Sequence, residues 1–264
     1  MNIQSFKRSL SVFGWLLWVD MRLLGKDFFS NLLDASAWPT VLILVNGYIM
    51  PSLGMPAHYG AFTTVSMVVV MGAYTAWAGS MALAADLAGE RAISYELTLP
   101  LPYWMVWIKC GLALAVRAAA FNIMPLFIGK VLLGSRFDLS NFSLIQFLVM
   151  YTVSCLFFGM FALWSTVITN TAEAHSRLEL RLIGPMFFLN GWTASWEAMY
   201  AVSAALGVFV RFLPWIYAYE GCRAAILGQT GYISLPVCVG MLIFFTVLIT
   251  GVSVWLFKKR MDCL

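Results

Sequence analysis

Charge is scarce in this chain of 264 residues: 11% of the residues are charged, whereas 62% are hydrophobic. A soluble domain carries about 25% charged residues, so a soluble fold of this composition would lack the polar surface that must face water. A lipid bilayer removes that requirement, because side chains that face lipid are themselves apolar. No Pro-, Gly- or Ser-rich linker divides the sequence. We therefore expect an all-α integral membrane protein with residues 1–264 in one domain.

Motifs for catalysis and cofactor binding are also missing. The five cysteines are odd in number and form no C-x-x-C pair, which argues against a metal site or a disulfide framework. Two Gly-Lys pairs, at 25–26 and 129–130, lack the upstream glycine of a P-loop. His58 and His175 are expected on opposite sides of the membrane, where they cannot share a metal. We expect no catalytic residue, metal or cofactor in this chain, and no nucleic-acid partner.

Residues 4–30 are amphipathic. On a helix their large apolar side chains share one face, and basic side chains lie on the opposite face. With Trp15 and Trp18 at headgroup depth, this pattern is typical of a helix in the membrane interface. A first spanning helix is the alternative, but four basic residues in one stretch would be costly in hydrocarbon.

Six apolar stretches follow, each near the ~20 residues that a helix needs to cross a bilayer. We place these spans at 35–54, 61–86, 104–126, 142–168, 180–200 and 234–257. In the second span, small residues recur at every fourth position, which favours the close approach of another helix. These residues are Gly72, Ala76, Ser80, Ala84 and Ala88.

Lys and Arg set the expected orientation. Six spans place both termini on one side, which carries Lys7, Arg8, Arg22, Lys26, Arg91, Lys109, Arg177, Arg181, Lys258, Lys259 and Arg260. The other side carries Lys130, Arg136, Arg211 and Arg223. Because cytoplasmic loops are enriched in Lys and Arg, both termini are expected in the cytoplasm.

Residues 201–232 are too apolar for an ordinary loop. A seventh full span would send the basic C-terminus outside, so we expect a re-entrant helical hairpin over 201–228, packed against other helices near the outer surface. Glu220 and Arg223 are three residues apart and are expected to form a structural pair on one helical face. Alternatively, Glu197 at the outer end of the fifth span could pair with Arg211 or Arg223. Tyr217 fits the interfacial aromatic belt.

The loop over 88–102 is polar enough to leave the bilayer, and its spacing suits a short helix closed by Pro100. Such a helix would present its charges and Tyr95 to the cytosol as a docking element. An ordinary interfacial turn is the other interpretation, and the spacing alone leaves both open.

Arg117 lies within the third span, roughly 22 Å beyond Pro102 at the rise of a helix. A cation at that depth needs a partner, a water-filled cavity or a functional reason. It either contacts an anionic group of a substrate or forms a buried pair with a carboxylate or helix carbonyls. Lys109, two turns earlier, is expected to reach the cytoplasmic headgroups.

The order of these pieces resembles the permease subunit of ABC-2 type exporters, also called type V ABC exporters. The family's loop pattern E-R…G-T-x-E-x-L…x-P-L is matched by Glu90-Arg91, Tyr95-Glu96-Leu97 and Leu99-Pro100-Leu101, with Ser94-Tyr95 where Gly-Thr is usual. Lys109 matches a frequent lysine at the start of the third span. A later pattern P…F-x-x-G is matched by Pro185, Phe188 and Gly191. The pattern N-P-x-x-Y-x-x-E-x-x-R is matched by Pro214, Tyr217, Glu220 and Arg223, although Leu213 replaces the asparagine.

This resemblance implies that residues 88–99 are a coupling helix in the groove of a separate ATPase subunit. The expected contacts are Glu90, Arg91, Tyr95, Glu96 and Leu97. The hairpin residues Pro214, Tyr217, Glu220 and Arg223 would be structural or gating elements. Two copies of the chain would form the pathway in a bacterial inner membrane, with ATP and Mg²⁺ on the partner subunit. The substrates of such permeases include lipid-linked glycans, lipids and drug-like amphipathic molecules, and Arg117 is the candidate residue of the pathway.

Two other functions stay open. A channel or scaffold subunit without energy coupling would tolerate charge reversal at Arg91 and Glu96. An intramembrane enzyme that modifies lipids would need clustered histidines or carboxylates, and the sequence shows no such cluster.

Overall fold

The computed structural model describes residues 3–26, 28–89, 93–169 and 171–262, and within them the chain is helical, with no strand. The amphipathic N-terminus is α1 (Ile3–Lys26), and α2 (Phe28–Leu44) follows it. The remaining elements are η1 (Val45–Ile49), α3 (Met50–Ser52), α4 (Tyr59–Ala88), α5 (Ile93–Thr98), α6 (Tyr103–Phe121), α7 (Met124–Leu133), η2 (Gly134–Arg136), α8 (Leu144–Ile168), α9 (Ala172–Leu178), η3 (Glu179–Ile183), α10 (Gly184–Leu189), α11 (Trp196–Val202), α12 (Ala204–Val210), α13 (Trp215–Leu227) and α14 (Leu235–Asp262).

Among the described residues, five helices are long and apolar enough to cross a membrane, which confirms the class predicted from composition. They cover Phe28–Ser52, Tyr59–Ala88, Tyr103–Arg136, Leu144–Ile168 and Leu235–Met261. They correspond to five of the six predicted spans. The predicted interfacial stretch 4–30 ends earlier than expected, because Phe28 already begins α2.

The prediction of one continuous helix over 180–200 is wrong. The structure has a helical run from Ala172 to Leu189, then non-helical residues 190–195, and α11 begins at Trp196. Gly191 has a φ of 112°, a left-handed conformation that side chains disfavour and that commonly ends a helix. The run before the break also carries charged residues and is not among the five candidate spans.

The helices α4, α6 and α8 form the centre of the bundle. Of the 18 most apolar consecutive residues of α4, 61% are buried, whereas the corresponding share is 17% in the first and last candidate spans. Helices α2 and α14 therefore lie at the periphery of the bundle. The stripe of small residues on α4 allows a neighbouring helix to approach closely, as predicted. A Cβ on Gly72 would lie 2.6 Å from Nδ2 of Asn122, so only glycine leaves room for that contact.

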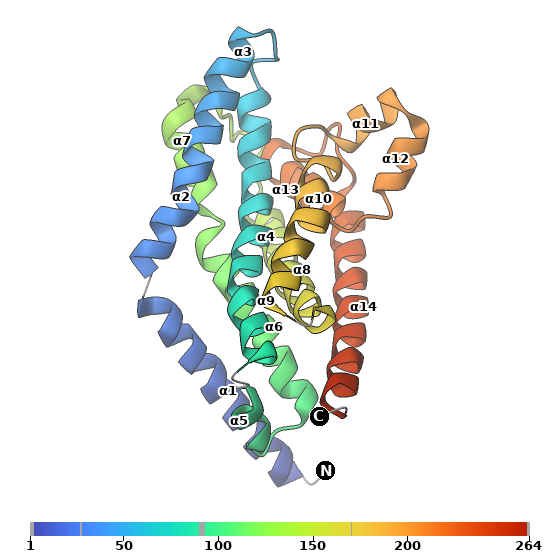
Figure 1. Cartoon of the computed structure of the whole chain (residues 1–264). Helices are drawn as coiled ribbons and strands as arrows, with labels where there is room; N and C mark the ends of the chain where they lie inside the picture. The colour runs from blue at the N-terminus through green and yellow to red at the C-terminus, as the bar shows by residue number, and fades with distance from the viewer. Residues whose placement is uncertain (1–2, 27, 90–92, 170, 263–264) are drawn as a thin grey trace.

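Both termini lie at the same end of the bundle, together with α5 (Figure 1). The short helices α3, α11 and α12 lie at the opposite end. The last turn of α14 is fixed to the end of α8, because Arg260 donates hydrogen bonds to the carbonyls of Thr166 and Thr169 at 3.2 and 2.9 Å.

Candidate functional site

The predicted docking loop contains a helix of six residues, α5, at the end of the bundle that carries the termini. The carboxylate of Asp86 accepts a hydrogen bond from the backbone N–H of Ile93 at 3.0 Å and so fixes the start of α5. Ile93 is buried and Leu97 packs against the core, whereas the Tyr95 side chain is 71% exposed. Glu90 and Arg91, which belong to the predicted contact set, lie outside the described residues.

Lys109 joins α5 to two longer helices. Its Nζ lies 2.7 Å from Oε1 of Glu96 in α5 and 3.2 Å from Oδ2 of Asp20 in α1. Nearby, the hydroxyl of Ser9 donates to the carbonyl of Pro100 at 2.9 Å. The prediction that Lys109 reaches the headgroups is wrong, because the residue is only 3% exposed and ends on these two carboxylates. Through it, α1, α5 and α6 are tied together.

Replacing Lys109 by methionine is expected to lower the free energy of unfolding by about 2 kcal/mol. The substitution leaves Asp20 and Glu96 facing each other without a cation, but both carboxylates keep some contact with solvent, so the cost is below that of a fully buried pair. Lys258→Met, at an exposed position of α14, is the matched control. Thermal unfolding in detergent measures stability, and trypsin cleavage within α1 reports its release. If Lys109→Met and Lys258→Met unfold at the same temperature and are cleaved within α1 at the same rate, Lys109 does not hold α1 against the bundle.

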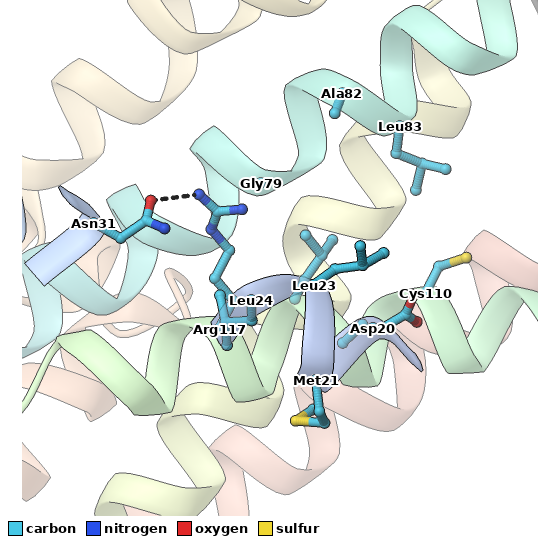
Figure 2. Close-up of a pocket in the computed structure, with 12 residues that line it drawn as sticks. Asp20, Met21, Leu23, Leu24, Asn31, Gly79, Ala82, Leu83, Cys110 and Arg117 are labelled. Atoms are coloured by element: carbon cyan, nitrogen blue, oxygen red, sulfur yellow. Dashed lines mark hydrogen bonds between the residues drawn. The ribbon is translucent and has the colours of Figure 1, made fainter. Parts of the chain in front are cut away.

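Arg117 lies where two pockets meet, of about 420 and 720 Å³, and both are also lined by Asn31. The smaller pocket is also lined by Asp20, in the C-terminal half of α1, as Figure 2 shows. The larger one extends toward Trp38 of α2 and Tyr74 of α4. A pocket of several hundred Å³ is the size that binds small molecules.

The partner of Arg117 is an amide, not a carboxylate. Its Nη2 donates to Oδ1 of Asn31 at 3.1 Å, and its Nε is buried without a hydrogen-bond partner. Among the described residues, no carboxylate lies within ion-pair distance of this guanidinium. The predicted alternative of a buried pair with a carboxylate is therefore wrong for the part of the chain that the structure describes.

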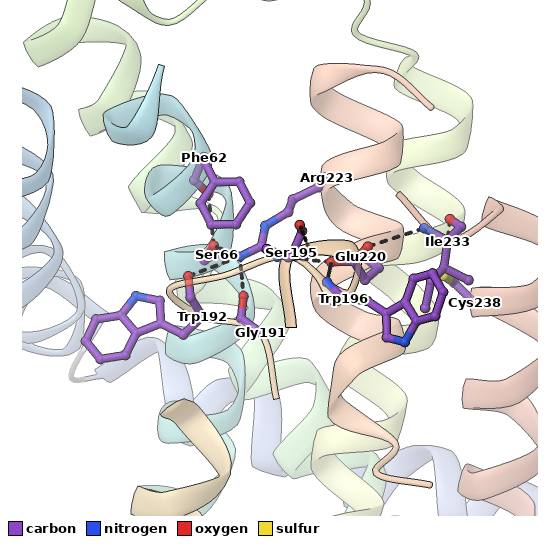
Figure 3. Close-up of polar contacts among 11 residues, drawn as sticks. Phe62, Ser66, Gly191, Trp192, Ser195, Trp196, Glu220, Arg223, Ile233 and Cys238 are labelled. Carbon is purple, nitrogen blue, oxygen red and sulfur yellow. Dashed lines mark hydrogen bonds and ion pairs between the residues drawn. The ribbon is translucent and has the colours of Figure 1, made fainter. Parts of the chain in front are cut away.

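Glu220 and Arg223 form the predicted structural pair. Both side chains are fully buried, and Nη1 of Arg223 lies 3.3 Å from Oε1 of Glu220. Figure 3 shows that the pair spans the helix break. Arg223 donates to the carbonyls of Gly191 and Trp192 and to the hydroxyl of Ser66 on α4.

The carboxylate of Glu220 binds backbone N–H groups that follow the break. It accepts the backbone N–H of Trp196, at the first turn of α11, at 3.1 Å and that of Ile233, just before α14, at 3.3 Å. A helix end leaves such groups without intrahelical partners. Non-helical backbone among membrane helices must satisfy them within the protein. The pair therefore replaces the backbone hydrogen bonds that the break removes.

The other residues of the predicted hairpin make local contacts. Pro214 lies at the start of α13. The Tyr217 hydroxyl donates to the carbonyl of Arg211 at 2.7 Å, and the guanidinium of Arg211 stacks 3.9 Å from the Trp196 ring. Tyr217 is buried, so its predicted place in the interfacial belt is wrong.

Sequence reasoning missed one buried polar cluster beside the C-terminal half of α4. His175 of α9 stacks on Trp77 with ring centroids 4.2 Å apart, and its Nε2 lies 2.9 Å from the hydroxyl of Ser80. Its Nδ1 lies 3.3 Å from the hydroxyl of Thr169, so both ring nitrogens have a partner. No signal in the sequence marks the pairing, because α4 and α9 are far apart along the chain. Within the described residues, no group of three or more His, Cys, Asp or Glu side chains is arranged to hold a metal ion.

Comparison with known proteins found no matching family model, no matching curated protein and no matching solved structure. The function of this chain is therefore inferred from its own residues and their geometry.

Proposed function

We propose that this chain is the transmembrane subunit of an ATP-binding-cassette exporter that is driven by a separate ATPase subunit. The observation that carries the proposal is the placement of α5. This short helix exposes Tyr95 at one end of the bundle, while its opposite face is bound through Glu96 and Lys109 to α1 and α6. A partner that moves α5 would thereby move two long helices.

The proposed topology has six crossings. The run α9–η3–α10 would form the fifth crossing together with the segment after its break, and α11 to α13 would form the re-entrant hairpin. Two findings support this assignment. The termini share one end of the bundle, and the fully buried Glu220–Arg223 pair satisfies the backbone at the break. Both termini and α5 would face the cytoplasm of a bacterial inner membrane, as the distribution of Lys and Arg indicates.

In the proposed mechanism, two copies of this chain enclose the substrate pathway and two ATPase subunits bind beneath them. ATP and Mg²⁺ are bound by the ATPase subunits. Closure of the ATPase pair pushes on α5, and the Lys109 contacts pass that displacement to α1 and α6. Arg117 lies on α6 two turns beyond Lys109, so the same displacement reaches the two pockets. Nucleotide then selects between two arrangements of the permease helices.

Site-specific crosslinking tests the proposal. Ser94 is exposed on α5, and Ser135 is exposed on η2, which follows α7 toward the other end of the bundle. The Ser94→Cys and Ser135→Cys variants of the full chain are treated in cell membranes with a bifunctional thiol crosslinker, and products are identified by mass spectrometry. We expect Ser94→Cys to give a product with a P-loop ATPase whose yield changes with ATP and vanadate, and Ser135→Cys to give none. The unmodified chain provides the background from its native cysteines.

The same experiment separates the rival functions. A channel or scaffold subunit without energy coupling predicts no nucleotide-dependent product from Ser94→Cys, and that result would overturn the proposal. An intramembrane lipid-modifying enzyme predicts that the purified chain alone converts a lipid substrate, which the exporter proposal does not allow.

A further inference from the structure

The two pockets beside Arg117 carry a charge pattern that a purely anionic ligand does not explain. The larger pocket is lined by one guanidinium, from Arg117, and by two carboxylates, from Asp34 and Glu179. Asp34 follows Asn31 by three residues on α2, so both project from the same face of that helix. Negative charge thus exceeds positive charge around this pocket, although a cation sits at its junction with the smaller one.

Arg117 is equipped to bind an anion. A guanidinium has five N–H donors in a planar fork that matches the oxygens of a phosphate. Within the described residues it donates one hydrogen bond, to an uncharged amide, and no carboxylate lies within ion-pair distance of it. A cation that deep in a membrane helix is expected to have a counter-charge. A bound phosphate would supply it.

The larger pocket also has groups that bind a cation. Trp38 and Tyr74 line it with ring centroids 6.4 Å apart, and both rings are partly exposed. The faces of Trp and Tyr rings attract ammonium groups. Asp34 and Glu179 line the same pocket and add the complementary charge. An ammonium group would therefore be held by aromatic faces and carboxylates at once.

We infer that these pockets bind the zwitterionic headgroup of an aminophospholipid, with the phosphate on Arg117 and the ammonium group between Trp38, Tyr74 and the two carboxylates. A lipid is favoured over a soluble molecule of the same charge pattern because Met71, Phe121 and Phe187 also line the pocket. Leu33 and Val41 on α2 are exposed nearby in the sequence and offer an apolar surface for acyl chains.

The depth of Arg117 distinguishes this lipid from an ordinary boundary lipid. It lies fourteen residues after Tyr103, roughly 21 Å along the helix, so a headgroup held there lies inside the bundle and not at the end of α6. The assignment of this lipid as cargo rests on the proposed exporter function, whereas its binding does not.

Binding is tested on the purified full chain in detergent by native mass spectrometry. Phosphatidylethanolamine and phosphatidylglycerol of identical acyl chains are compared at equal concentration. We expect at least about ten-fold tighter binding of phosphatidylethanolamine, because it alone carries the ammonium group. Soluble phosphoethanolamine serves as a competitor, and we expect it to displace the lipid only weakly because it lacks the acyl chains.

Variants assign the two ends of the headgroup. Arg117→Gln is expected to weaken phosphatidylethanolamine binding about ten-fold or more, as for the loss of a charged hydrogen-bond partner, and Arg117→Lys is expected to weaken it less. Trp38→Leu and Asp34→Asn are expected to remove the preference for phosphatidylethanolamine over phosphatidylglycerol. Arg177→Gln, at an exposed site on α9, is the matched control and is expected to bind as the unmodified chain does. A thermal-unfolding midpoint is recorded for each variant to show that it is folded. The comparison of the two lipids on the unmodified chain does not depend on any variant.

Three results would overturn the inference. The first is equal binding of the two lipids by the unmodified chain, which would describe an anion site only. The second is tight binding of soluble phosphoethanolamine without its acyl chains. The third is a disulfide between two copies through Ala37→Cys in cell membranes, together with no lipid bound by the unmodified chain, which would assign the pockets to a second copy of the chain. Each of these leaves the Ser94→Cys result untouched, so failure of the lipid inference and failure of the exporter proposal can be told apart.

Discussion

Replacing Arg223 by methionine should lower the free energy of unfolding by about 3–5 kcal/mol, the usual cost of leaving a buried charge without its partner. The substitution strands the Glu220 carboxylate in a site with no exposed surface and removes the donors to Gly191, Trp192 and Ser66. The measurement is thermal unfolding of the purified protein in detergent. Proteolysis at residues 190–195 reports whether the break has opened.

The matched control for Arg223→Met is a second Glu–Arg pair in the same protein. Glu173 and Arg177 lie 3.0 Å apart on α9, with side chains that are 80% and 65% exposed. Arg177→Met is expected to change stability by no more than about 0.5 kcal/mol, as is usual for an exposed pair.

A double variant tests why the buried pair is present. Many buried ion pairs can be replaced by apolar side chains without loss of stability. We expect Glu220→Leu combined with Arg223→Met to remain unstable, because three backbone groups at the break and one just before α14 would still have no partner. Recovery of the original stability in the double variant would show that the charges, and not the backbone contacts, account for the loss.

Gly159→Leu is expected to destabilise the bundle by about 3 kcal/mol, at the upper end of the usual cost of overpacking. A Cβ on Gly159 would lie 2.5 Å from the carbonyl oxygen of Gly111 and 2.6 Å from the backbone nitrogen of Ala115. Backbone atoms cannot turn aside as a flexible side chain can, so α6 and α8 would have to separate. Two measurements report the effect: the unfolding midpoint, and the fraction of protein that stays monodisperse after extraction into detergent.

Gly251→Leu is the control for Gly159→Leu. Gly251 lies within α14, and a Cβ added to it would have open space around it, with no neighbouring atom within 4 Å. Both substitutions gain the same intrinsic helix propensity. The difference between them therefore isolates the contact of α6 with α8. Similar losses in the two variants would contradict the close packing of these helices.

Local patterns are sufficient to predict most of the fold. Apolar stretches of about twenty residues identify five helices, because lipid requires every backbone group to be satisfied within the helix. The small stripe through Gly72 identifies a face of α4 that a neighbour approaches closely. The break at Gly191 escapes prediction, because its backbone partner is Arg223, which is 32 residues away.

The site is predictable only where its partners are neighbours in sequence. The spacing of three residues between Glu220 and Arg223 predicts their pairing, and the pair is present. The depth of Arg117 correctly marks it as a residue in need of a partner, but nothing local points to Asn31, 86 residues away. The prediction for Lys109 is wrong for the same reason, because its partner Asp20 lies on α1, far back along the chain. Long-range polar contacts leave no periodic trace in one sequence.

The helix break has a consequence for biogenesis. The carbonyls of Gly191 and Trp192 receive their hydrogen bonds from Arg223, and Trp196 is bonded to Glu220. These partners do not exist until translation has passed residue 223, so α10 and α11 emerge from the ribosome before the groups that stabilise their junction. A nascent chain that ends before α13 must keep this junction in water, in the translocon or on a chaperone. The junction between α10 and α11 therefore reaches its final hydrogen bonding only after α13 has been synthesised.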